Sequence, residues 1–192
     1  EYKIHNAILI IMYENINKSI EKHRIKFNKY FKNLLYSYLS KNELSNAMLY
    51  GTSDGGKRIR PYLISIFSDI VNLPKKNYYN LSAAVECIHS YSLIHDDLPC
   101  MDDDDYRRGK LSVHKKFNEA QAILAGDSLH DIAFEILSNN TTHKDPIIRI
   151  KLVRLLSSVV GLKGLAGGQS LDLYFENKNT HISNIIKMYN MK

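Results

Sequence analysis

IHDDLPCMDDDDYRRG, residues 94–109, is the stretch on which the interpretation of this chain depends. It holds six aspartates within ten positions, and Arg107, Arg108 and Gly109 follow at once. Carboxylates this close repel one another unless a cation lies among them, and arginine guanidinium groups suit phosphate oxygens. Mg²⁺ usually takes one or two protein carboxylates and completes its shell with phosphate and water. The stretch therefore predicts a magnesium-bound polyphosphate ligand.

A solvated acidic loop is the alternative, since runs of charge usually form a solvated surface. A calcium-binding EF-hand loop does not fit, because that pattern needs alternating ligands, a glycine at its sixth position and a glutamate at its twelfth. The apolar approach AAVECIHSYSLIH, residues 83–95, favours the metal site because it delivers the acids from a buried element. Pro99 disfavours helix through Leu98, and a local bulge there would return Asp102 to the rim that carries Asp96.

A basic stretch, GGKRIRP, lies upstream at residues 55–61. Its two glycines allow close approach of the backbone, and Lys57, Arg58 and Arg60 supply cations beside a predicted helix N-terminus, which is a natural anion site. It is not a Walker A loop, because GxxxxGK[ST] is absent. A plain basic loop before a helix is the alternative. Together with the arginine pair of the acidic stretch, it favours two diphosphate sites over one.

The helical approach to the acids carries further candidate residues. His89 lies seven positions before Asp96, about two turns back on the same helix face, although a lone helical histidine is usually structural. His95 points about 100° away from Asp96 and is less suited as a ligand. Tyr91 either lines an apolar pocket under the acids or belongs to the core. In GGQSLD, residues 167–172, the glycines predict a kink or a close helix crossing near a cavity.

Length and composition agree with one globular domain that binds an anion. The chain has 192 residues, 44% of them hydrophobic, which predicts a single domain with a sizeable core. A formal charge of +6 fits an anionic ligand, although coding bias of an AT-rich genome explains the abundant Lys, Asn, Ile and Tyr equally well. No Lys/Arg-dense segment alternates with exposed aromatics, so nucleic-acid binding has little support.

Cysteine content and the apolar run at residues 7–12 bear on the compartment. Two cysteines without metal-site spacing predict a reduced, cytoplasmic setting. The run is too short to span a bilayer and lacks a cleavage signal, so neither a membrane span nor a signal peptide is expected.

Helical periodicity extends along nearly the whole chain, with few prolines and glycines to interrupt it. We see no strand alternation, hairpin dipeptide or internal repeat, and expect an all-α helical bundle with the acidic stretch at one mouth. The expected helices cover residues 6–39 (as one helix or two), 42–50 (ending at Gly51), 61–71, 78–98, 113–137, 146–175 and 181–191.

These motifs resemble those of the trans-type polyprenyl diphosphate synthases, and most closely those of the bacterial farnesyl diphosphate synthases. The resemblance runs from about residue 47 to the end and rests on GGKRIRP, AVECIHSYSLIHDDLPCMDDDDYRRG, HKKFNEAQAILAGDSL and GLAGGQSLDL in that order. DDxxxxD followed by RRG is highly specific. The resemblance implies an all-α bundle of the isoprenoid synthase type, truncated at the C-terminus, with residues 1–192 as a single incomplete domain.

The resemblance also implies roles for individual residues. Asp96 and Asp102 match magnesium ligands, with Asp97 supporting them. Arg107 matches an allylic diphosphate contact, as does Lys192, which falls on the lysine of a KTG motif. Tyr91 matches a residue that limits the product to C15. The residues that match the isopentenyl diphosphate site are Lys57, Arg60, His89 and Arg108, and those that match the catalytic set are Asp96, Asp97, Asp102 and Arg107.

The implied reaction is a prenyl transfer in isoprenoid biosynthesis. An allylic diphosphate (dimethylallyl or geranyl) condenses with isopentenyl diphosphate, with Mg²⁺ as cofactor and farnesyl diphosphate as the expected product. The released pyrophosphate serves as base. The family further implies a homodimer, located in the cytoplasm.

One departure from the family pattern leaves alternatives open. The family carries a second aspartate-rich motif, DDxxD, and nothing after Asp172 supplies it. The chain is then a fragment of a prenyltransferase or the product of a broken gene, a noncatalytic diphosphate-binding partner subunit of a complete synthase, or a truncated remnant without function. The intact first motif and its basic residues favour the first of these.

Overall fold

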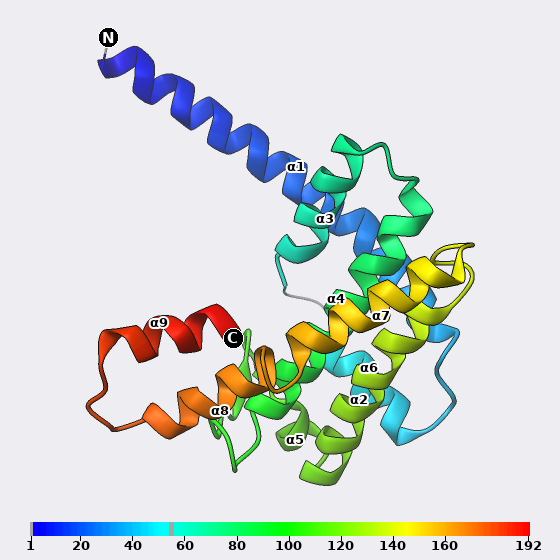
Figure 1. Cartoon of the computed structure of the whole chain (residues 1–192), viewed down its shortest axis with the longest axis vertical. Helices are drawn as coiled ribbons and strands as arrows, with labels where there is room; N and C mark the ends of the chain where they lie inside the picture. The colour runs from blue at the N-terminus through cyan, green and yellow to red at the C-terminus, as the bar shows by residue number, and fades with distance from the viewer. Residues whose placement is uncertain (1, 54–55) are drawn as a thin grey trace.

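The computed structural model describes the backbone of residues 2–53 and 56–192, and the side chains of residues 13–53 and 56–192. Gly55 of the basic stretch and the side chains of the apolar run at residues 7–12 lie outside this description. None of the described helices is both long and apolar enough to cross a membrane. The elements in chain order (Figure 1) are α1 (Tyr2–Tyr36), α2 (Glu43–Thr52), α3 (Ile59–Ile70), α4 (Lys75–Asp96), β1 (Tyr106–Arg107), β2 (Lys110–Leu111), α5 (Val113–Lys116), α6 (Glu119–Ser138), α7 (Pro146–Val160), α8 (Leu165–Phe175) and α9 (Ile182–Met191).

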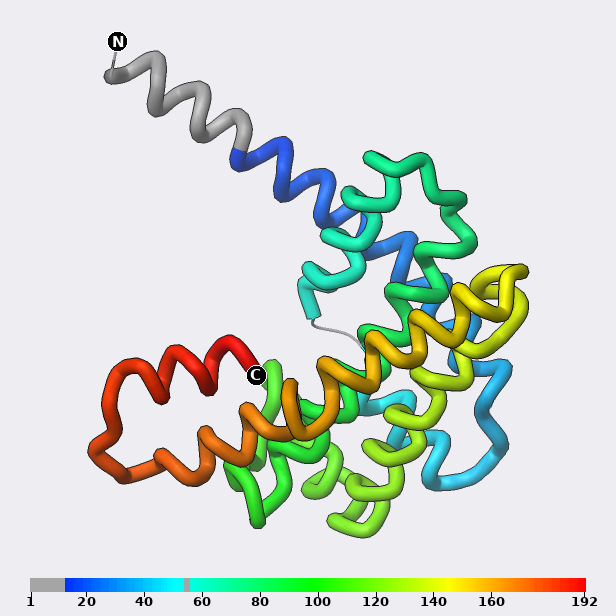
Figure 2. Tube along the Cα trace, in the orientation of Figure 1, coloured from blue at the N-terminus to red at the C-terminus, as the bar shows by residue number. Residues whose placement is uncertain are grey.

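The core forms where α4 packs along α6, the most extensive contact between two described elements. Small side chains let the two backbones approach: Ala83 and Cys87 of α4 and Ala125 and Ala133 of α6 are all fully buried. α2 packs on both of these helices, α3 packs on α4, and α7 packs on α6. Figure 2 shows the first described turns of α1 leading away from this body, and Tyr13 is accordingly 68% exposed. The all-α bundle predicted from periodicity is confirmed.

Asparagine and aspartate caps explain where several helices begin. Asn42 starts α2 by accepting a hydrogen bond from the Ser45 amide at 2.8 Å. Asn118 does the same for α6 through Gln121. This second cap also explains why the helix expected over residues 113–137 is divided: α5 ends before Asn118, and α6 begins after it.

Two other helix boundaries differ from expectation because of glycine contacts. The helix expected over residues 146–175 is interrupted between α7 and α8, where a Cβ on Gly164 would lie 2.0 Å from the Val159 carbonyl oxygen. Conversely, α2 does not end at Gly51 but continues to Thr52. A Cβ on Gly51 would lie 2.5 Å from Cδ1 of Ile94, so this glycine serves close packing of α2 on α4 rather than helix termination.

A short hairpin corrects the expectation of a chain without strands. β1 and β2 pair antiparallel, with Tyr106 opposite Leu111 and Arg107 opposite Lys110. Between them Arg108 and Gly109 have φ of 54° and 76°, the left-handed pair that a tight two-residue hairpin turn requires. In the sequence, only the Arg108–Gly109 dipeptide indicates this turn. The hairpin places Arg107 at the end of β1 and Arg108 in the turn itself.

The glycines of α8 provide the predicted close helix crossing. A Cβ on Gly168 would lie 2.5 Å from the Lys192 amide nitrogen, and one on Gly167 would lie 2.8 Å from Cε of Met191. The end of α9 therefore rests directly against α8, as Figure 1 shows at the end marked C. This crossing brings Lys192 back toward the acidic stretch.

Candidate functional site

The acidic rim lies where α4 ends. After Asp96 the chain loops outward and returns, so that the Asp102 amide donates to the Asp96 carbonyl at 2.9 Å. The Asp103 amide donates to the Leu98 carbonyl at 3.1 Å and closes the loop. The bulge predicted from Pro99 is thus present. It brings the backbones of Asp96 and Asp102 together, with Asp96 half-buried and Asp102 exposed.

Electrostatics at this rim favour a bound cation. Burial raises the pKa of Asp96 above its ordinary value, the Lys192 ammonium lowers it, and the neighbouring Asp102 carboxylate raises it again. A half-buried carboxylate beside like charges is stabilised in its charged form by a cation. Lys192 supplies one positive charge and is itself ion-paired with Asp172 of α8. The rim therefore consists of carboxylates from three segments around one lysine.

Asp97 has a different surrounding from its neighbour. Its side chain is 3% exposed, and its Oδ1 accepts a hydrogen bond from Nε of Arg107 at 2.6 Å. This hydrogen bond is the main cause that raises the pKa of Arg107. The carboxylate expected to support the metal is therefore directed at the arginine of β1, which it orients toward the rim.

A cluster of basic residues, the basic cluster, lies around His89. Burial, together with the charges of Arg60 and Arg108, lowers the pKa of His89 to about 4, so the imidazole is neutral at pH 7. The Arg108 guanidinium lies beside Gly56, since a Cβ there would be 2.9 Å from Nη1. Lys57 and Arg60 are exposed. The structure thus brings the basic stretch, the histidine and the hairpin together.

Arg58 corrects one part of that prediction. It is 6% exposed, and its Nη1 lies 2.5 Å from Oε2 of Glu86 in the core. Nε donates to Asn28 at 2.8 Å, and Nη2 donates to the Thr52 carbonyl at 2.7 Å. The left-handed φ of 52° at Arg58 turns the side chain inward. Arg58 therefore fastens α1, α2 and α4 together and does not face an anion.

An apolar cleft of about 800 Å³ opens beside the rim, between α4 and α8. Tyr91 lies on its wall, with its ring 5.3 Å from that of His95 and 5.2 Å from that of His130. The cleft reaches Asp96 on one side. Tyr91 therefore lines the cleft and also packs against the hydrophobic core, so both predicted alternatives describe it. The other lining residues are Ser92, Leu98, Cys100, Met101, Ile123, Leu165, Ala166, Gln169, Ser170, Leu173 and Tyr174.

Sequence reasoning missed three residues of this region. Glu86 neutralises Arg58 from 28 positions away, Asp172 holds Lys192, and His114 lies beside the acidic stretch. Glu86 is the one with a usable signal: a charged residue inside the apolar stretch AAVECI predicts a buried partner.

The helical bundle that carries the aspartate rim, the basic cluster and the apolar cleft is of the isoprenoid synthase type, since solved structures of such enzymes superpose on it with TM-scores of 0.84 and 0.87. The chain belongs to the family described as polyprenyl synthetase, whose model matches residues 41–192.

Individual relatives agree with this assignment. The farnesyl diphosphate synthase of Buchnera aphidicola subsp. Acyrthosiphon pisum is 44% identical over 171 residues, which are 88% of this chain and 60% of that protein. That of Escherichia coli K12 is 45% identical over 76% of this chain and 49% of its own length. A geranyltransferase structure from Legionella pneumophila superposes with a TM-score of 0.87 at 35% identity, covering 93% of this chain and 63% of that one. The chain thus spans about half to two thirds of the length of these relatives.

Proposed function

We propose that this chain carries the first metal site and the two diphosphate sites of a prenyltransferase that condenses an allylic diphosphate with isopentenyl diphosphate. One observation supports this above all: the aspartate rim, the basic cluster and the apolar cleft all lie around the C-terminal part of α4. The first two suit the two diphosphate groups, and the cleft suits a hydrocarbon chain.

Asp96 and Asp102 would hold Mg²⁺, since the rim offers the carboxylate oxygens that this cation prefers and leaves room for phosphate and water. When bound, Mg²⁺ supplies positive charge that stabilises the departing pyrophosphate. Arg107, oriented by Asp97, and Lys192 would bind the same diphosphate. The Asp172 carboxylate competes for Lys192 in the absence of substrate.

The isopentenyl diphosphate would lie at the basic cluster, held by Lys57, Arg60 and Arg108. His89, neutral at pH 7 with its pKa near 4, would donate one N–H to a diphosphate oxygen. A charged imidazole is not required, because the three cations already balance the anion. The bound anion in turn raises the pKa of the histidine.

The reaction needs dry surroundings, and the mostly apolar lining of the cleft favours them. The allylic C1–O bond breaks and its electron pair leaves with pyrophosphate. The double bond of isopentenyl diphosphate then forms a bond to C1, and a proton lost to the pyrophosphate completes the five-carbon extension. Tyr91 on the cleft wall would limit the product to C15, farnesyl diphosphate.

We further propose that the protein works as a homodimer. Helix α3 presents an apolar stripe in which Leu63 is 47%, Phe67 66% and Ile70 69% exposed. These residues share one helix face at spacings of three and four, and a stripe of this kind favours burial against protein. Light scattering of the purified chain tests this, with Phe67→Glu as the variant expected to shift the mass toward the monomer.

The test of the activity is incubation of the chain with geranyl diphosphate, labelled isopentenyl diphosphate and Mg²⁺. Labelled farnesyl diphosphate supports the proposal. Binding of both substrates without product would instead support a noncatalytic diphosphate-binding subunit, and absence of binding would reject both. A full-length farnesyl diphosphate synthase run beside it controls the assay.

A further inference from the structure

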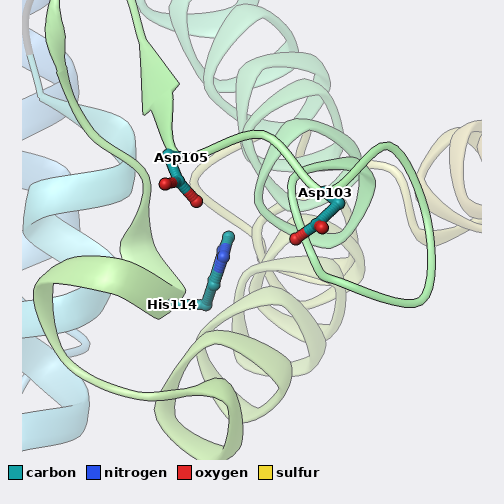
Figure 3. Close-up of side chains that lie close together, drawn as sticks. All are labelled: Asp103, Asp105 and His114. Carbon is teal, nitrogen blue, oxygen red and sulfur yellow. The ribbon is translucent and has the colours of Figure 1, made fainter.

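A second group of possible metal ligands lies behind the acidic rim. Among the residues that the structure describes, Asp103, Asp105 and His114 each place one ligand atom within 4.8 Å of the others. Figure 3 shows the His114 ring lying between the two carboxylates, with the aspartates on the loop that leads into β1 and the histidine on α5. Asp96 and Asp102, the proposed magnesium ligands, are not among the three.

The state of His114 points independently to a ligand. The residue is 6% exposed, and its Nε2 is buried without a hydrogen-bond partner among the described residues. Its Nδ1 lies 3.2 Å from Oγ of Ser112, and that hydroxyl donates to the Asp105 carbonyl. With its proton so used, the Ser112 oxygen accepts the Nδ1–H. Nε2 then keeps a free lone pair, which is the form that binds a metal ion.

We propose that Asp103, Asp105 and His114 bind Zn²⁺ or a similar divalent cation, at a site separate from the magnesium rim. One imidazole nitrogen with two carboxylate oxygens suits Zn²⁺, whereas Mg²⁺ prefers oxygen ligands alone. Tetrahedral Zn²⁺ sites often use three protein ligands with water in the fourth position. Coordination also satisfies the buried nitrogen, which is otherwise costly.

Lys115 is the competitor for this site. Its Nζ lies 2.8 Å from Oδ1 of Asp105, and both side chains are largely exposed. Exposed ion pairs contribute little to stability, so a divalent cation displaces the lysine readily. Ligands around Zn²⁺ stand about 3.3 Å apart at its usual bond lengths. The exposed carboxylates of Asp103 and Asp105 reach that spacing by side-chain rotation, while the buried imidazole stays in place.

A cation here would fasten the acidic loop to α5. Asp103 directly follows Asp102 and has a left-handed φ of 51°, so its side chain is directed away from its neighbour's rim. The proposed Zn²⁺ site would therefore hold one side of the loop, while the aspartate rim would bind Mg²⁺ on the other side. Binding of the cation itself does not depend on the proposed prenyltransferase activity.

Calorimetric titration of the purified chain with Zn²⁺, in excess Mg²⁺ to occupy the oxygen-only rim, tests the proposal. We expect one Zn²⁺ per chain. The Asp103→Asn/Asp105→Asn double variant and His114→Gln should each weaken it at least about tenfold. Asp104→Asn, in the same loop but outside the group, is the matched control and should bind as the parent does. Cobalt substitution should give a visible spectrum with nitrogen ligation that His114→Gln lacks.

Because His114 is buried, its variant needs a check of folding by circular dichroism, and the exposed aspartate pair carries the test if that variant unfolds. Asp96→Asn/Asp102→Asn should retain Zn²⁺. Failure of the parent chain to bind Zn²⁺, or equal affinity in the Asp103/Asp105 variant, overturns the proposal. So does loss of Zn²⁺ in the rim variant alone, which would assign the ion to the rim.

Discussion

Two nitrogens of the Arg107 guanidinium lie against one carboxylate oxygen of Asp97, Nε at 2.6 Å and Nη2 at 2.5 Å. Asp97 is buried while Arg107 is part-exposed. The buried Asp97 carboxylate is therefore the fixed member of the pair, and it orients the Arg107 guanidinium toward the rim. This contact distinguishes Asp97 from the adjacent Asp96, although the two residues have the same side chain.

Removing either member of this pair should have different consequences. Arg107→Ala leaves the Asp97 charge buried and unpaired, which should cost about 3 kcal/mol of unfolding free energy and abolish binding of geranyl diphosphate. Asp97→Asn should weaken that binding while Mg²⁺ affinity is kept. Urea unfolding and calorimetry measure these quantities. If Mg²⁺ binding disappears in Asp97→Asn, the residue is a metal ligand and not a positioning residue.

The acidity of Asp96 should appear in the pH dependence of stability without metal. Its folded-state pKa is raised above the ordinary value of 3.8, chiefly by burial. The folded chain therefore binds the proton more tightly than the unfolded chain. The stability it contributes is fully present below pH 3.8 and is lost as pH rises through the raised pKa.

Thermal unfolding with and without Mg²⁺ checks this. Asp96→Asn should remove the loss of stability with rising pH and should also abolish Mg²⁺-dependent prenyl transfer. In the parent chain, Mg²⁺ should restore stability at neutral pH. An unchanged turnover in Asp96→Asn would contradict the metal assignment.

His89 should titrate far below an ordinary histidine. Its pKa is lowered from 6.5 to about 4 in the folded state, so the unfolded chain binds more protons between these values. The stability that His89 contributes is present above pH 6.5 and is lost as pH falls through about 4. Proton NMR of the imidazole should show the low midpoint, and adding pyrophosphate should raise it. A midpoint near 6.5 in the free chain would show that the ring is not buried beside the arginines.

Tyr91 should determine product length. Replacing its ring with a methyl group lengthens the cleft at the wall where it packs on His130, so Tyr91→Ala should give products beyond C15. Chromatography of the dephosphorylated products measures this in an active preparation. Tyr106→Ala, on the exposed face of the hairpin, is the matched control with unchanged products. Products of equal length in both variants would show that Tyr91 does not limit product length.

The Arg58–Glu86 pair should matter for folding and not for ligands. Both side chains are at most 5% exposed, so Glu86→Gln leaves a buried charge without its counterion and should cost about 3 kcal/mol. Affinity for isopentenyl diphosphate should stay within about twofold. Denaturant unfolding and calorimetry measure the two effects. A large loss of affinity at unchanged stability would mean that Arg58 faces the anion after all.

The helical class and the order of the motifs could be read from the chain, because helical periodicity and the aspartate, arginine and glycine motifs are local features. The loop after Asp96 was equally predictable, since Pro99 acts on the residue just before it. The ends of the helices were less predictable. Asn118 and Gly164 interrupt runs whose apolar periodicity continues across them, and only the cap and the contact with Val159 show the break.

The sequence by itself determined that this chain is an all-helical member of the polyprenyl synthetase family with an aspartate rim and two basic segments. The tertiary structure decided which charged side chains are held by a buried partner. Arg58 turns inward to Glu86, and Asp97 turns to Arg107, while identical neighbours stay at the site. The physical reason is that a side chain's direction depends on its backbone dihedral and on partners distant in sequence, and no local pattern encodes either.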